Sequence, residues 1–237
     1  MATIRIRLTA ASPLDRELAG APDAVGSDST CVAAPDLLAR VPEASSEALR
    51  LASKLQASTS EDDRFILVAG FNEKESSSEI AFQLAVGLSE IDGQSVLLVD
   101  ANLHNPWLHK RFGIEAQPGL TNVLGTSAGL LADAVRVVNP TLAVLPAGNL
   151  KADSSIFTST EFSDLLEIQL RPRYRFIIFN SAPFIQFVDA NLIASRADGV
   201  VITLTSGRHH RTDLLDLKNE LESLKSKIFG TVLCEDK

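Results

Sequence analysis

The sequence predicts an α/β fold in which a parallel β-sheet is flanked by helices on both faces. Short runs that are apolar at every position alternate with longer segments in which apolar residues recur at helical spacing. Continuous apolar runs are typical of parallel strands, because helices cover both faces of such a sheet. With 237 residues, 45% of them hydrophobic, the chain is long enough to bury a large core without disulfides.

The predicted elements begin with a helix from Ser46 to Gln56, for which Ser46 is a suitable N-cap. Ligands of parallel sheets bind beyond the carboxyl ends of the strands, so the residues that follow each strand form the candidate site. We expect strands at residues 65–69, 95–99, 142–145, 176–179, 200–203 and 230–234, and further helices at 75–91, 158–170, 188–197 and 212–225.

The N-terminal segment differs in composition from the rest of the chain. Residues 4–8 alternate apolar and basic side chains and predict a short edge strand, whereas residues 10–45 are rich in Ala, Pro, Ser and Asp. The latter composition is typical of a linker. We therefore expect an N-terminal arm over residues 1–45 and one folded domain over residues 46–237.

Charge and cysteine content exclude several classes of protein. Lys and Arg number 22 against 30 Asp and Glu, and the net charge of −8 argues against nucleic-acid binding. Cys31 and Cys234 are the only cysteines, too few for a disulfide framework or a cysteine zinc site. No run reaches the ~20 apolar residues of a membrane span, and the N-terminus has no apolar signal core. We expect a cytoplasmic protein.

The segment at residues 70–79 lies where a phosphate-binding loop belongs, between a strand and a helix. Such a loop wraps phosphates with glycine amides, and it supplies a lysine and a Mg²⁺-binding hydroxyl. Here it reads GFNEKESSSE and contains no Gly-Lys pair. Its three glutamates outnumber its one lysine, which disfavours a nucleotide. Carboxylates are favourable at a helix N-terminus, so we expect side chains to replace the ligand there.

Several colinear motifs carry a resemblance to a known family. They are the segments at residues 96–113 (VLLVDANLHNPWLHKRFG), 118–124, 142–148, 174–183, 189–190, 197–201 and 230–233. With these motifs, the stretch from about residue 43 to 234 resembles the cytoplasmic domain of bacterial tyrosine kinases (BY-kinases) of polysaccharide export. These kinases are relatives of the MinD and ParA ATPases. The resemblance implies a P-loop NTPase-like sheet.

Residues 76–78 depart from the family's phosphate-binding loop. Ser76 and Ser77 stand where the family has the Gly and the Lys, and Ser78 stands at the Mg²⁺-binding hydroxyl. Replacing the Lys by Ser removes the charge nearest the β- and γ-phosphates.

The metal side of the implied site is degenerate as well. Asp100 keeps the first carboxylate of the family's Asp-x-Asp motif, but Asn102 replaces the second. Asn180 replaces the Asp of the later metal-side motif, and His104 replaces the Arg of the Leu-Arg pair. Two amides in place of carboxylates weaken a Mg²⁺ shell and remove the base expected to activate the acceptor hydroxyl.

These departures predict a catalytically inactive, pseudokinase-like protein that regulates or scaffolds exopolysaccharide synthesis or export. Ser77, Asn102 and Asn180 are its degenerate catalytic positions. We expect no cofactor.

Two alternatives remain open. One is a weak ATPase or protein-tyrosine kinase, in which Ser76, Ser77, Ser78 and Asp100 would bind Mg-ATP or Mg-ADP, with Ser78 and Asp100 on the metal. The other is a MinD/ParA-like spatial regulator.

The resemblance also implies partners. Glu47 and Arg50 match the first two positions of the family's Glu-x-x-Arg-x-x-Arg contact helix, although at this spacing they could instead pair with each other. The implied partners are a membrane polysaccharide co-polymerase, an active tyrosine kinase or another export component. Such a partner would place the protein at the periphery of the inner membrane. Assembly into a homo-oligomer stays open.

Other features are predicted to be structural. Tyr174, the one tyrosine, is expected to pack against the core, and we expect no self-phosphorylation on a tyrosine tail. His209 and His210 are expected in a solvated basic loop, and Phe184 and Phe187 are expected to fill space near the site.

Overall fold

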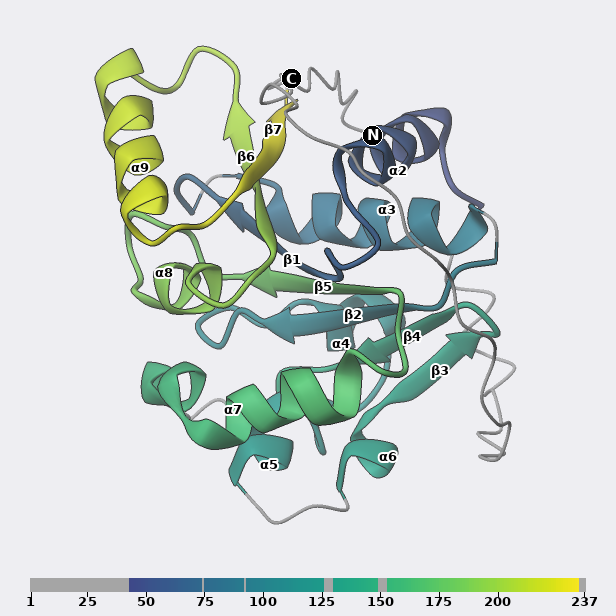
Figure 1. Cartoon of the computed structure of the whole chain (residues 1–237). Coiled ribbons are helices and arrows are strands. Elements are labelled where there is room, and N and C mark those ends of the chain that lie inside the picture. Colours follow the sequence, from purple (N-terminus) through teal and green to yellow (C-terminus); the bar gives the residue numbers. More distant parts are fainter. Residues whose placement is uncertain (1–42, 74, 92, 126–129, 149–152, 235–237) are drawn as a thin grey trace.

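The computed structural model describes residues 43–73, 75–91, 93–125, 130–148 and 153–234 (Figure 1). The strand predicted at residues 4–8 and most of the predicted arm lie outside these residues. None of the helices in the described ranges has the length and apolar character needed to cross a bilayer.

A seven-stranded sheet forms the centre of the molecule, in the order β3-β4-β2-β5-β1-β6-β7. All neighbours pair in parallel except β3 and β4, which are antiparallel. The predicted parallel sheet is thus confirmed, with one added edge strand. The strands are β1 (Phe65–Gly70), β2 (Val96–Ala101), β3 (Arg136–Asn139), β4 (Leu142–Leu145), β5 (Phe176–Ser181), β6 (Gly199–Thr205) and β7 (Ile228–Cys234).

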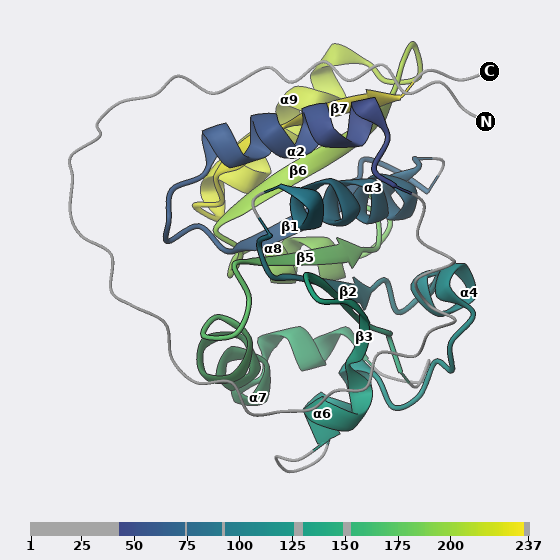
Figure 2. The same cartoon turned by 90° about the vertical axis from the view of Figure 1, so that its right-hand side faces the viewer.

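Helices cover both faces of the sheet, as predicted (Figure 2). Successive strand side chains point to opposite faces, so Ile66 and Val68 join one core cluster while Phe65 and Leu67 join the other. The first cluster packs under α2 (Ser46–Ser58), α3 (Ser77–Glu90) and α4 (Leu108–Phe112). The second packs under α5 (Leu120–Gly125), α6 (Leu130–Ala134), α7 (Thr160–Asp164), α8 (Asp189–Ala194) and α9 (Arg211–Ser223).

Several predicted boundaries differ from the structure, including those of three helices. Ser45, not Ser46, caps α2, because its Oγ accepts the N–H of Ala48 at 3.1 Å. The helix predicted at 158–170 is divided into a 3₁₀ helix (Ser154–Thr158), α7 and a π-helix (Leu165–Leu170), since Ser159 is extended and caps α7. The helix predicted from residue 75 starts at Ser77.

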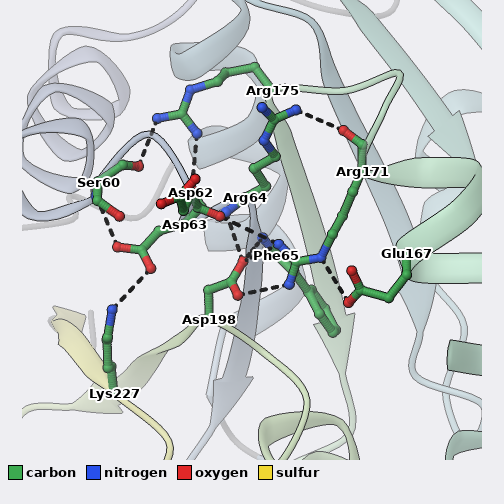
Figure 3. A network of polar contacts seen from close by, with 10 residues as sticks. All are labelled: Ser60, Asp62, Asp63, Arg64, Phe65, Glu167, Arg171, Arg175, Asp198 and Lys227. Carbon is green, nitrogen blue, oxygen red and sulfur yellow. Dashed lines mark hydrogen bonds and ion pairs between the residues drawn. The ribbon is translucent and has the colours of Figure 1, made fainter. Parts of the chain in front are cut away.

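A polar network ties together the amino ends of the strands, opposite the candidate site (Figure 3). Asp198, just before β6, accepts hydrogen bonds from the backbone N–H groups of Arg64 and Phe65 at 2.8 and 2.7 Å. The Arg171 guanidinium contacts both oxygens of the same carboxylate, at 2.9 and 2.8 Å. One carboxylate therefore sets the start of β1 relative to β6 and the π-helix.

Asp63 provides a second junction in this network (Figure 3). Its carboxylate accepts the Ser60 N–H at 2.9 Å and the Lys227 ammonium at 3.1 Å. Its carbonyl accepts a hydrogen bond from Arg175 at 2.9 Å. The starts of β5 and β7 are thereby joined to the segment that leads into β1. The candidate site lies at the opposite edge of the sheet, where the parallel strands have their carboxyl ends.

Candidate functional site at the carboxyl edge of the sheet

The predicted site residues meet where β1, β2 and β5 end. Asp100 in β2 lies directly opposite Asn180 in β5, and Asn102 follows one residue after β2. β1 runs into the loop that leads to the serines at the start of α3. Because these strands are parallel, their carboxyl ends share one edge, and the structure brings Asp100, Asn102 and Asn180 into contact there.

Asp100 is fully buried, and each of its carboxylate oxygens has two hydrogen-bond donors. Oδ2 accepts the backbone N–H groups of Trp107 and Leu108 at 2.8 and 2.9 Å. Oδ1 accepts the backbone N–H of Asn102 at 3.3 Å and the side-chain NH₂ of Asn180 at 3.2 Å. Burial raises the pKa of Asp100 to about 6, and the hydrogen bonds limit the rise. The carboxylate thus has a complete internal set of partners.

These residues do not fit a Mg²⁺ ion. Mg²⁺ takes oxygen ligands in near-octahedral geometry, but the Asn180 amide directs its NH₂ group, not its oxygen, toward Asp100. The side-chain oxygen of Asn102 accepts the Asn105 N–H at 3.0 Å. Among the described residues, no group of three or more His, Cys, Asp or Glu side chains could hold a metal.

The edge nevertheless keeps the polar character of a ligand site. Several buried oxygens of β5, β6 and α8 have no hydrogen-bond partner in the described part of the chain: Asn180 Oδ1, Ser181 Oγ, Thr203 Oγ1 and Asp189 Oδ1. Hydroxyl, amide and carboxylate oxygens of this kind are suited to buried water. The edge therefore presents several buried oxygens that can still accept a hydrogen bond.

The serines at the start of α3 lie where the sequence placed them. Ser76 is the exposed N-cap, Ser77 is buried and Ser78 is half-buried. Ser76 makes no side-chain capping hydrogen bond, so the expectation that side chains hold this end of the helix is not met by the N-cap itself. Glu79 instead accepts a hydrogen bond from Gln83 at 2.9 Å. A buried hydroxyl at Ser77 offers no positive charge to a phosphate.

Glu75 turns away from the helix and into the protein. Its Oε2 accepts the Thr205 hydroxyl at 2.7 Å, and its Oε1 lies 2.7 Å from Nε2 of His209. The solvated loop predicted for His209 was therefore wrong, because only 5% of this side chain is exposed. Sequence reasoning missed this pair. The one available signal was that a histidine and a glutamate both follow strands that were expected to share an edge.

A second histidine–carboxylate pair lies beside the ends of β2 and β5. His104 Nε2 is 2.8 Å from Oδ2 of Asp189, whose side chain is fully buried. Phe187 stacks on the His104 ring with 3.7 Å between the centroids, and Phe184 is buried in the core. The two phenylalanines thus fill space near the site, as predicted, whereas the role of Asp189 was not anticipated.

A cleft of about 470 Å³ opens beside these groups, lined by Asn72, Glu73, Gln186 and Arg208. Its lining combines amides with one acidic and one basic side chain. It therefore has no concentration of positive charge that would attract a polyphosphate.

The predicted partner surface lies on α2. Glu47 and Arg50 are both exposed and, although both are described, no ion pair joins them. Their opposite face packs on α3, where Gly87 lies directly against the backbone of Ala48. Tyr174 packs half-buried against the core, as predicted.

Comparisons with known proteins agree on one group of relatives. No family model matches the chain. Over 178 residues it is 29% identical to the tyrosine-protein kinase YwqD of Bacillus subtilis, covering 75% of this chain and 74% of that protein. Over 181 residues it is 30% identical to the tyrosine-protein kinase Ptk of Acinetobacter johnsonii, covering 75% of this chain but 24% of that longer protein.

Solved structures show the same relationship. The crystal structure of the VpsO kinase domain superposes with a TM-score of 0.72 at 26% identity, covering 81% of this chain and 97% of that domain. The MinC:MinD complex of Aquifex aeolicus gives a TM-score of 0.58 at 19% identity, over 72% of this chain and 68% of the matched chain, and shows a shared fold.

Proposed function

The chain is a homologue of the bacterial tyrosine kinases, and from this premise we propose that it is a catalytically inactive member with a regulatory or scaffolding role. The role is proposed in exopolysaccharide synthesis or export. Supporting this setting, the chain is 27% identical over 176 residues to a succinoglycan biosynthesis transport protein, ExoP of Rhizobium meliloti, covering 73% of this chain and 22% of ExoP.

The observation that carries the proposal is the closed hydrogen-bond shell of Asp100. Phosphoryl transfer depends on neutralising phosphate charge with Mg²⁺, a lysine and backbone amides. In this chain the remaining carboxylate binds four N–H donors, and a serine, Ser77, stands at the lysine position. Among the described residues, a nucleotide would meet neither a metal-binding cluster nor a lysine at the position of Ser77.

The proposed mode of action is docking to another protein through the helix α2. Glu47 and Arg50 present exposed opposite charges on a helix whose other face is anchored to α3. The partner would be a membrane polysaccharide co-polymerase, an active kinase or another export component. Such a partner would hold the protein beside the inner membrane. The docking unit is the domain at residues 46–237, preceded by the arm at residues 1–45.

Calorimetric titration with Mg-ATP and with Mg-ADP tests the loss of nucleotide binding. We expect dissociation constants in the millimolar range or weaker. Micromolar binding that is lost in Ser78→Ala would overturn the proposal, because the hydroxyl of Ser78 is the one that retains the family's metal position.

Restoring the phosphate-binding loop tests the metal side separately. The double variant Ser76→Gly with Ser77→Lys returns the glycine and the lysine. We expect little ATPase activity from it, because Asn102 and Asn180 still leave a metal poorly held. Strong turnover by this double variant would show that the metal side is competent, in favour of the enzymatic alternative.

A further inference from the structure

Glu75 joins two segments that belong to different parts of the chain. It ends the loop after β1, while Thr205 ends β6 and His209 lies in the connection to α9. Both carboxylate oxygens are used, Oε2 by the Thr205 hydroxyl and Oε1 by the His209 ring, each at 2.7 Å. The loop after β1 is therefore fastened to the β6–α9 connection by a side chain rather than by a ligand.

The same loop is closed on its other sides by backbone contacts. The Phe71 N–H donates to the Thr203 carbonyl at 3.1 Å, and the carbonyl of Gly70 accepts the Phe184 N–H at 3.0 Å. Glu75 N–H donates to the Asn72 carbonyl at 3.2 Å. Glu75 also packs so tightly on Gly70 that a Cβ at residue 70 would lie 2.7 Å from Glu75 Cβ. The last residue of β1 is thus in direct contact with Glu75, close to the end of the loop.

The Glu75–His209 contact is buried. The Glu75 side chain is 0% exposed and that of His209 is 5% exposed, so water screens them little. The Phe71 ring covers the His209 ring edge-on, with 4.6 Å between the centroids. Burial, with a further contribution from Glu75, raises the pKa of the Cys234 thiol to about 11, so this thiol stays neutral beside the pair. A buried carboxylate that lost its partners would be strongly destabilising.

We propose that the Glu75–His209 contact is an internal clasp that orders the loops at the carboxyl edge, in the role that a bound nucleotide would otherwise have. The loops at this edge then keep the same arrangement without a bound nucleotide. The segment after β5 depends on it, because the Phe184 and Ile185 N–H groups donate to the carbonyls of Gly70 and Phe71. The inference rests on the proposed loss of nucleotide binding.

Hydrogen–deuterium exchange of the whole chain tests the clasp. In Glu75→Ala we expect amides of the loop after β1 and of the β6–α9 connection to exchange at least about tenfold faster, relative to amides of β2. Glu73→Ala is the matched control, because it removes an exposed glutamate from the same loop and should leave exchange unchanged. His209→Ala should reproduce the effect, and the double variant should add little.

The outcomes separate the clasp from the proposed function. Unchanged exchange in Glu75→Ala, or an equal increase in β2, overturns the clasp while leaving the proposed function intact. Mg-ADP should not alter exchange in the unmodified chain. If Mg-ADP slows exchange of the loop amides there, the proposed loss of nucleotide binding is wrong, whatever the variants show.

Discussion

Asp198 holds the amino edge of the sheet together, and its replacement by alanine should be among the most destabilising single changes outside the apolar core. The carboxylate accepts the N–H groups of Arg64 and Phe65 and a two-pronged contact from Arg171 (Figure 3). Alanine would leave two backbone donors and a guanidinium without this partner. Arg171 keeps its contacts with Glu167 and the Asp62 carbonyl, so the main loss falls on the backbone N–H groups at the start of β1.

The magnitude follows from burial. Removing one partner of a buried ion pair typically costs ~3–5 kcal/mol. The side chains of Arg171 and Asp198 are 19% and 20% exposed, so water partly compensates, and we expect a loss of about 3 kcal/mol. For a domain of this size that loss corresponds to a fall in Tm of about 6–12 °C.

Urea denaturation provides the assay, with Glu167→Ala as the control. Glu167 also pairs with Arg171, at 3.0 Å, but it is 63% exposed and its loss should cost only ~0.5 kcal/mol or less. The m-value should stay the same in both variants, because the surface exposed on unfolding does not change. Equal losses for Asp198→Ala and Glu167→Ala would refute the argument that burial sets the difference.

Two further predictions concern the site and the partner helix. Because the folded pKa of Asp100 is raised to about 6 from its ordinary 3.8, the folded state favours the protonated form, and stability should be gained as the pH falls from about 6 to 4. Asp100→Asn cannot titrate, so the stability difference between the two proteins should change by up to roughly 3 kcal/mol over that range; a constant difference would contradict the pKa. Gly87→Ala would place a Cβ 2.6 Å from the Ala48 carbonyl and should destabilise by ~1–3 kcal/mol in urea, while a neutral result would show that α2 is free to shift.

Much of the sheet could be predicted because its strands are buried on both faces. A strand such as β1 is apolar at every position, and this pattern identifies it without knowledge of its neighbours. The edge strand β3 was missed for the opposite reason. Of its residues only Val138 is buried, so it lacks a continuous apolar run. The division of the helix predicted at 158–170 was missed because apolar spacing does not register the cap formed by Ser159.

The candidate site was only partly predictable. Asp100, Asn102 and Asn180 follow strands and carry motif positions, so their meeting at one edge could be inferred. The direction of each side chain could not. With its oxygen toward Asp100, Asn180 could help to bind a metal, whereas with its NH₂ toward Asp100 it donates a hydrogen bond to the carboxylate. The structure has the second orientation, and only the assembled hydrogen bonds specify this orientation.

The amino-acid sequence alone determined the layered architecture and the absence of a Gly-Lys pair from residues 70–79. Both follow from the sequence because burial periodicity and residue identity are local properties of a chain. Tertiary structure decided which distant side chains pair at the carboxyl edge of the sheet. Glu75 and His209 lie 134 positions apart, and His104 and Asp189 lie 85 positions apart. No local pattern links such residues, since their pairing depends on which strand ends become neighbours and on how little water reaches them.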